Sequence, residues 1–313
     1  MSDAFAALVA RLAASRTITA DDTLGIRRAV WADGTITADE ADGIMALNAA
    51  CDRRSREWLD FYSEVMVDYI VRQQEPQGYV DDAKAAWLMA AIDRDGRVDS
   101  LGELELLVKL MEVADSVPGA LRSYALRQVE TAVMVGDGPT RSGRLEAGCI
   151  NAIEVELMRR MIFAAGGDGA YVVSSEEADM LFRLKDATLG NDNASSWQDL
   201  FVKGVGNHLM AHRNYETLSR DDERQLNSYA ADNHVSLGRF FGRMIGRGHS
   251  ELSSAALSLP YRMNDDAAAA VDHAVTPVEA AWLRGHIDGD HQVDAMEKAL
   301  LDFVYAETGQ KVA

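Results

Sequence analysis

The sequence predicts an all-helical protein made of two similar halves, each with two helix–loop–helix units. Only five prolines occur in 313 residues, and proline is the residue least compatible with a helix interior. Apolar residues recur at spacings of three and four, as in 103–114 and 296–306, which is the period of an amphipathic helix. No alternating run rich in Val, Ile and Thr indicates a sheet.

Three sequence blocks occur twice in the same order, which indicates an internal duplication. The pairs are 24–42 with 157–179, 56–71 with 195–210, and 85–107 with 280–301. Trp58 falls on Trp197 and Trp87 on Trp282, so we expect these rings to anchor the core. The second half is longer, and its largest insertion lies at about 211–275.

The boundary between the halves falls in the turn GDGPTRSG at 136–143, a run of helix-breaking residues. We therefore expect one domain over 1–140 and a second over 141–313. Length alone also suggests about two domains.

The charge of the chain restricts its partners. Fifty acidic residues against 31 basic ones give a net charge of −19, which repels nucleic-acid phosphates and anionic lipid surfaces and attracts cations or basic proteins. The N-terminus reads as an amphipathic helix and not as a signal peptide, and no stretch matches a membrane span. Two isolated cysteines suit neither a disulfide framework nor a thiolate zinc site. The expected location is the cytoplasm.

Four Asp-Gly-type loops are candidate sites for Ca²⁺ or another divalent cation. A loop of the EF-hand type offers oxygen ligands at positions 1, 3, 5, 7 and 9, Gly at 6, and a bidentate Glu at 12. The candidate ligands are Asp33 and Glu40 in the first loop, Asp93, Asp95, Asp99 and Glu103 in the second, Asp168 and Glu177 in the third, and Asp288, Asp290, Asp294 and Glu297 in the fourth.

The fourth loop fits the template best, because its four acids fall in register. In the second loop Glu103 comes one residue late, and no loop has Asp at position 1. The alternative interpretation is that these turns only join helices, with acidic residues capping the next N-terminus. By analogy with EF-hand pairs, Ile36 and Val98 are expected to pair as short strands, as are Tyr171 or Val172 with Val293.

The first loop carries the motif ADGTITADE at 32–40, and the second and fourth carry related motifs at 91–103 and 286–297. In these scattered blocks the chain resembles the TerB-like, tellurite-resistance-type helical family. The resemblance implies an all-α fold with an internally paired helical core and acidic residues that bind divalent metal ions. The metal-facing pairs that it implies are Asp33 with Glu40, Asp93 with Glu103, Asp168 with Glu177, and Asp288 with Glu297.

Two further patterns have a chemical interpretation. His208 and His212 lie four residues apart, a spacing that suits zinc, but Leu209 stands where a metalloprotease helix has Glu. The repeat also sets His208 opposite Tyr69, which indicates a packing position. Arg239, Arg243 and Arg247 form a stripe that we expect to contact acidic residues or a partner.

The sequence thus favours a non-catalytic cytoplasmic protein that binds Ca²⁺ or a similar cation, in stress response or metal homeostasis. A possible protein partner is not identified. The alternative from another class is a metal-independent helical interaction scaffold, and a weaker third is a hydrolase that uses His208 and His212.

Overall fold

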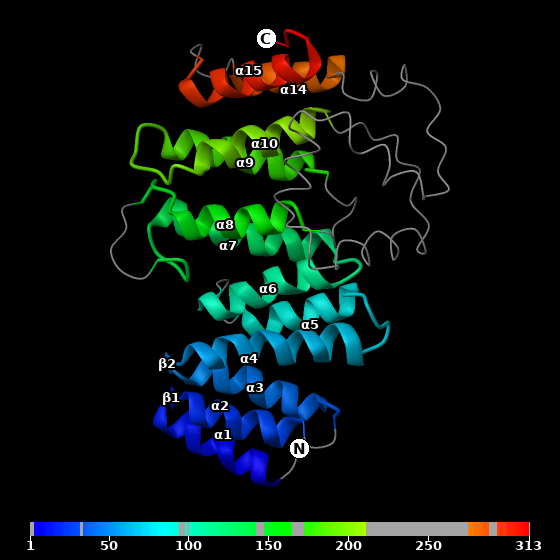
Figure 1. Cartoon of the computed structure of the whole chain (residues 1–313), viewed down its shortest axis with the longest axis vertical. Helices are drawn as coiled ribbons and strands as arrows, with labels where there is room; N and C mark the ends of the chain where they lie inside the picture. The colour runs from blue at the N-terminus through cyan, green and yellow to red at the C-terminus, as the bar shows by residue number, and fades with distance from the viewer. Residues whose placement is uncertain are drawn as a thin grey trace, which may run out of the picture. The chain divides into compact units, whose positions relative to one another are not determined.

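The computed structural model describes residues 3–31, 34–93, 98, 100–141, 147–164, 172–210, 275–287 and 293–312. Within these residues nearly all of the regular secondary structure is helical (Figure 1), which confirms the all-α prediction. Its contacts divide it into two compact units. Unit 1 comprises Met1–Val172 and Arg183–Trp197, and unit 2 comprises Val173–Phe182 and Gln198–Ala313. This division does not test the proposed domains 1–140 and 141–313, which stay a prediction.

Unit 1 is a succession of helices of similar length. They are α1 (Asp3–Ser15), α2 (Ala20–Val30), α3 (Ala38–Ala50), α4 (Arg56–Val67), which continues as the π-helix η1 (Asp68–Gln73), α5 (Asp82–Ile92), α6 (Leu101–Val113), α7 (Gly119–Val135), α8 (Ala152–Ile162) and the second part of α9 (Ser175–Thr188). The even-numbered helices pack in order, α2 on α4, α4 on α6 and α6 on α8, and α1 packs on α3. Figure 1 shows this order from blue to green.

The centre of unit 1 is the apolar face of α4. Trp58, Phe61 and Tyr62 are fully buried there, and the Trp58 and Phe61 ring centroids lie 5.7 Å apart. Each such side chain stabilises the fold by roughly 1.5–3 kcal/mol through burial alone. The expected anchor role of Trp58 and Trp197 is confirmed, since both are buried, whereas Trp87 and Trp282 are partly exposed.

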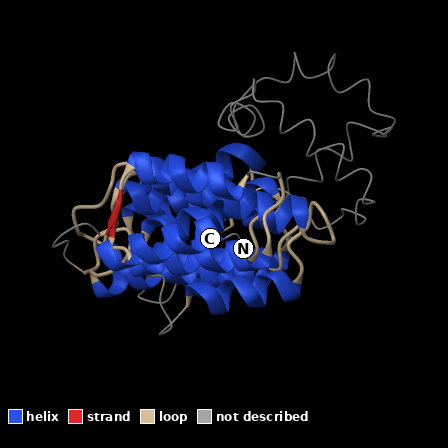
Figure 2. Ribbon diagram, turned by 90° about the horizontal axis from the view of Figure 1, so that it is seen from below, coloured by secondary structure: helices blue, strands red, loops and turns tan. Residues whose placement is uncertain are grey.

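Two strands of two residues each are the only regular β-structure among the described residues. β1 (Thr17–Ile18) runs parallel to β2 (Arg53–Arg54), with Thr17 opposite Arg53. Figure 2 shows them in red at one side of the helices. They connect the turn before α2 with the turn before α4, and the Ser55 N–H donates to the Ile18 carbonyl.

Five of the described helices begin with a capping box, in which the N-cap side chain accepts the N3 backbone N–H while the N3 side chain accepts the N-cap N–H. The boxes join Thr19 with Asp22 at α2, Thr37 with Glu40 at α3, Ser100 with Glu103 at α6, Asn151 with Glu154 at α8, and Asp294 with Glu297 at α15. Local sequence therefore determines where these helices start.

Unit 2 contains the first part of α9, most of α10 (Trp197–Met210), α14 (Pro277–Ile287) and α15 (Ala295–Thr308). Two glycines of α10 allow close packing. A Cβ at Gly204 would lie 2.5 Å from Leu181, and one at Gly206 would lie 2.5 Å from Phe303. The glycine-rich stretch 204–208 is thus a helix-packing feature, because glycine removes the side chain where two helices meet.

The caps also support the predicted duplication. By the sequence blocks, α2, α3, α4, α5 and α6 correspond to α8, α9, α10, α14 and α15. Thr19 and Asn151 stand at matched N-caps. Ser100 and Asp294 also match when Glu103 is aligned with Glu297, one residue out of the register that aligns Asp99 with Asp294. The duplication remains a prediction that this correspondence favours.

A turn begins at Gly136, where the sequence predicts one. Helix α7 ends at Val135, and Gly136 follows it in the left-handed conformation, with φ of 78°, which glycine adopts without steric cost. None of the helices in the described part of the chain is long and apolar enough to cross a membrane.

Candidate functional site

The closing glutamates of the four loops all stand at the third position of the following helix. Glu40, Glu103, Glu177 and Glu297 are each at least nine-tenths buried. Each carboxylate accepts the backbone N–H three residues earlier, at 3.0, 3.0, 2.8 and 2.9 Å respectively. The repeated glutamate therefore has a structural role as a helix cap, whether or not an ion binds.

The first loop is capped by Thr37. Glu40 Oε2 accepts the Thr37 hydroxyl at 2.9 Å as well as its N–H. Gly34 has a φ of 80°, a conformation that favours glycine over other residues. The Ile36 N–H donates to Gln73 Oε1 at 2.7 Å. Asp33 lies outside the described residues.

The second loop is closed around Glu103. Asn48 Nδ2 donates to Glu103 Oε1 at 3.0 Å, while the Ser100 N–H donates to Oε2. Asn48 Oδ1 in turn accepts the indole N–H of Trp58 at 3.1 Å. Both carboxylate oxygens of Glu103 are thus hydrogen-bonded in the core, and bidentate ion binding would have to displace these donors.

The register of the second loop differs from the EF-hand template. Its helix cap is Ser100 and not Asp99, so counting back from Ser100 as position 9 puts Asp93 at position 2, away from the ligand positions. Asp93 lies near Tyr124, whose pKa is raised by burial and by that carboxylate. Asp95 and Asp99 lie outside the described residues.

The third loop ends in a tightly held residue. The Val173 N–H donates to Asn207 Oδ1 at 2.8 Å, and its carbonyl oxygen lies 2.9 Å from His208 Nδ1. Ser174 and Glu177 follow as the cap, and Glu177 Oε2 accepts both the N–H and the hydroxyl of Ser174. Asp168 is not among the described residues.

The fourth loop differs from the other three in having an acidic N-cap. Asp294 Oδ1 accepts the N–H groups of Met296 and Glu297, at 2.7 and 3.0 Å, and Glu297 Oε2 accepts the Asp294 N–H. With Glu297 as position 12, Asp294 falls at position 9, in the register of a calcium loop. The N-terminus of α15 thus holds two carboxylates, which the helix dipole favours. Asp288 and Asp290 lie outside the described part.

The expected strand pairing of Ile36 with Val98 is wrong. Both backbone N–H groups are taken by amide side chains, Ile36 by Gln73 and Val98 by Gln128 at 3.1 Å. In the second half Val293 is more than half exposed, and Tyr171 is not described. Sequence reasoning missed these amide partners, because Gln128 is 30 residues from Val98 and no local motif marks it.

No group of three or more His, Cys, Asp or Glu side chains in the described ranges is arranged to hold a metal ion. Six of the predicted ligands lie outside those ranges: Asp33, Asp95, Asp99, Asp168, Asp288 and Asp290. The ligand set therefore stays a prediction. His212 and the arginine stripe of Arg239, Arg243 and Arg247 also fall outside the described residues.

His208, which the sequence set opposite Tyr69, is a packing residue. Its ring lies 4.8 Å from that of Trp282 in an edge-on arrangement, and Tyr69 makes the matching contact with Trp87 at 6.0 Å. A cluster around Trp282 was not predicted. The signal that marks it is the spacing of Trp282 and His286, four residues apart on one helix face.

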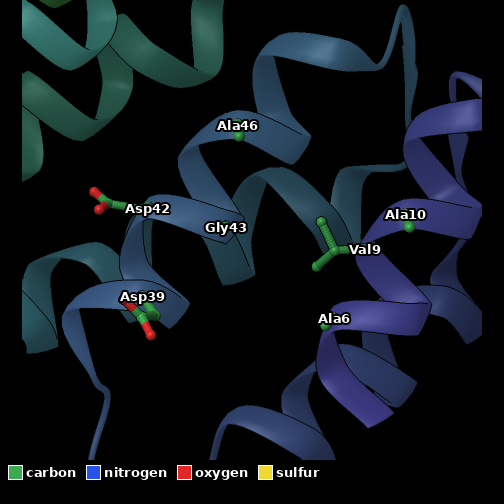
Figure 3. A pocket seen from close by; sticks show the side chains of 7 residues that line it. All are labelled: Ala6, Val9, Ala10, Asp39, Asp42, Gly43 and Ala46. Carbon is green, nitrogen blue, oxygen red and sulfur yellow. The ribbon is translucent and has the colours of Figure 1, made fainter. Parts of the chain in front are cut away.

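A shallow hollow lies between α1 and α3 in unit 1 (Figure 3), with a volume of about 520 Å³. Its walls are the small side chains of α1 and α3, with Asp39 and Asp42 at one side. Its lining residues are Ala6, Val9, Ala10, Asp39, Asp42, Gly43 and Ala46. Apart from the two aspartates no polar side chain lines it, and none of the predicted ligands does. It does not resemble a catalytic pocket, which combines an apolar cavity with convergent polar groups.

One buried ion pair and one partly exposed cluster of ion pairs hold α8 in place. Arg141 and Glu154 are almost fully buried, with Nε 2.8 Å from Oε1. Arg160 donates to Glu112 at 2.6 Å and to Glu105 at 2.9 Å, which joins α8 to α6. Sequence reasoning missed both, although Asn151 and Glu154 show a capping pattern. Removing one partner of the buried Arg141–Glu154 pair would leave an uncompensated charge in the core, so this pair has a structural role.

Comparison with known proteins adds no family assignment, since no family model, curated protein or solved structure matches this chain. The similarity to TerB-like proteins therefore rests on the loop motifs alone.

Proposed function

We propose that the protein is a non-catalytic, cytoplasmic divalent-cation binder of the TerB-like kind, with its strongest ion site in the fourth loop. The observation that carries the proposal is the N-terminus of α15, where Asp294 and Glu297 bring two carboxylates together at template positions 9 and 12. In the other three loops the matched N-cap is Thr or Ser. A role in stress response or metal homeostasis is part of the proposal.

The physical argument is electrostatic. Asp288 and Asp290 precede this N-terminus closely in sequence, so four acids lie within ten residues of a chain that carries a net charge of −19. Like charges at such spacing repel one another, and a bound cation relieves that repulsion. The absence of Asp at position 1 and of Gly at position 6 argues for a dissociation constant of roughly 10⁻⁴ to 10⁻³ M.

The test is a thermal melt of chelator-stripped protein with and without millimolar Ca²⁺, in wild type and Glu297→Gln. Glutamine supports a capping box as glutamate does, so the variant keeps the helix cap and loses the charged bidentate ligand. Ion binding to the native state at a hundredfold excess over Kd stabilises it by about 2.7 kcal/mol. We expect this stabilisation in wild type and its loss in Glu297→Gln.

Glu40→Gln is the matched control, because Glu40 is also a buried capping glutamate but follows a loop with one candidate aspartate. It should retain the full Ca²⁺ response. Equal Ca²⁺ shifts in wild type and Glu297→Gln would mean that the ion acts by screening the net charge, and would contradict the site.

A second candidate function is a metal-independent helical interaction scaffold. It is favoured by Glu103, both of whose carboxylate oxygens already accept hydrogen bonds within the core. A loop closed in this way needs no ion. Under this alternative the acidic surface binds a basic protein partner, and no Ca²⁺-dependent stabilisation appears in wild type or in either variant.

A further inference from the structure

In unit 2 the end of the third loop is held by α10. The neighbouring residues Asn207 and His208 bond the N–H and the carbonyl of Val173, at 2.8 and 2.9 Å. Because a carbonyl oxygen only accepts hydrogen bonds, Nδ1 of His208 must carry the proton and donate. Val173 directly precedes Ser174, the cap of α9. The start of α9 is therefore tied to the position of the His208 ring.

The His208 ring also contacts the ring of Trp282 on α14, and the two ring centroids lie 4.8 Å apart. The Trp282 indole N–H donates to Asp179 Oδ1 on α9 at 3.0 Å, and His286 Nε2 lies 3.2 Å from the same oxygen. The Trp282 and His286 rings are 4.4 Å apart. His286 stands in the last turn of α14, directly before the fourth loop. A continuous set of contacts thus leads from the third loop to the fourth.

We propose that His208, Trp282 and Asp179 form a relay that couples the start of α9 to the end of α14. Paired EF-hand loops are coupled through backbone strands, whereas here side chains make the connection. The relay goes beyond the proposed function, because it operates without a bound ion. Such coupling is reciprocal, so a change at either helix end shifts the other by the same free energy.

The first half offers a matched control. Tyr69 and Trp87 stand at the positions of His208 and Trp282, and their rings are in contact at 6.0 Å. However, the end of the first loop is held by Gln73 through Ile36. Among the described residues the Tyr69 side chain makes no hydrogen bond to that loop. The described part of the first half therefore has the aromatic contact but no counterpart of the hydrogen bond from His208 to Val173.

The test is backbone hydrogen exchange of the full chain, read by mass spectrometry, in Trp282→Leu and Trp87→Leu. In Trp282→Leu we expect the amides of 174–178 to exchange on the order of fivefold faster, within the range of coupling along packed side chains. In Trp87→Leu the amides of 37–41 should exchange at the wild-type rate. The amides of 300–304, in the buried centre of α15 in the same unit, report opening of unit 2 as a whole and should be unchanged in Trp282→Leu.

Wild-type exchange of 174–178 in Trp282→Leu would overturn the relay, and so would equal acceleration of 174–178 and 300–304. If Trp282→Leu does not fold, Trp282→Phe tests the relay in its place. It keeps an aromatic ring beside His208 and loses the N–H donation to Asp179, so 174–178 should exchange at least about twofold faster. Exchange at the wild-type rate in that variant would overturn the proposal.

Discussion

The second and fourth loops, which the predicted duplication matches with each other, use their closing glutamates differently. Glu103 is surrounded by donors, with Asn48 on one oxygen and the Ser100 N–H on the other. Glu297 shares its helix N-terminus with the carboxylate of Asp294. This difference indicates that capping the following helix is the common role of the glutamate after an Asp-Gly turn. Whether it also serves an ion depends on the residues around it.

The largest expected effect is that of removing the carboxylate from the closed loop. Glu103→Ala leaves Asn48 Nδ2 and the Ser100 N–H without their acceptors in the core, which costs about 3 kcal/mol of unfolding free energy. Urea denaturation measures this change. Asp60→Ala, at an exposed position of α4, is the control and should stay within about 0.5 kcal/mol of wild type. A Glu103→Ala cost as small as that of the control would show that the network does not stabilise the fold.

A second prediction compares how the two loop helices are anchored. Helix α6 is joined to α8 by Arg160, with Nε 2.6 Å from Glu112, whereas α15 carries the exposed pair Lys298–Asp302. Arg160→Met should cost about 2 kcal/mol, because it leaves partly buried carboxylates without a counter-charge. Lys298→Met should cost less than about 0.5 kcal/mol. Urea denaturation of both variants at neutral pH gives the comparison, and equal costs would contradict it.

The contribution of Arg160 to the unfolding free energy should also depend on pH. Burial raises the pKa of Glu112, but the hydrogen bonds and charge of Arg160 outweigh this and hold it below its ordinary value. A carboxyl with a depressed pKa in the folded state stabilises the fold above its unfolded pKa, and this stabilisation is lost as the pH falls through the folded pKa. The difference in unfolding free energy between wild type and Arg160→Met should therefore be largest at pH 7 and decrease below about pH 4. A difference in unfolding free energy that stays constant down to pH 3 would exclude this linkage.

The smallest expected effect concerns the N-caps. Ser100→Ala removes the side chain that accepts the Glu103 N–H and should cost about 1 kcal/mol. Asp294→Asn keeps a good N-cap and should cost only a few tenths of a kcal/mol, while it weakens the Ca²⁺ response of the fourth loop. Thermal melts with and without Ca²⁺ distinguish these effects. An undiminished Ca²⁺ response in Asp294→Asn would remove Asp294 from the ion site.

The local structure of this chain could be predicted well from its sequence, because helix starts depend on nearby residues. The pattern that ends in Glu40 or Glu297 marks both a calcium loop and a capping box, so it located the helix N-termini correctly and left their function open. The partners of these loops are distant. Asn48 is 55 residues from Glu103, and Val173 is 35 from His208. Only the packing of helices brings them together.

The prediction of strand pairing between Ile36 and Val98 failed for the same reason. The backbone N–H groups on which it relied are satisfied by Gln73 and Gln128, from helices whose positions the sequence does not specify. An analogy with a known loop pair supplies the register of the loop. It does not supply the neighbour that competes for the same hydrogen bond.

The order in which the even-numbered helices pack has a consequence for folding. Since α2 contacts α4, α4 contacts α6 and α6 contacts α8, most contacts of this layer join segments close in sequence. Chains with such local contacts close short loops and fold fast, and their stability is approximately a sum over neighbours. Helix α2, at the end of the series, is thus expected to open at lower free energy than α4, which packs on both α2 and α6. Unit 1 should therefore unfold from its end inward.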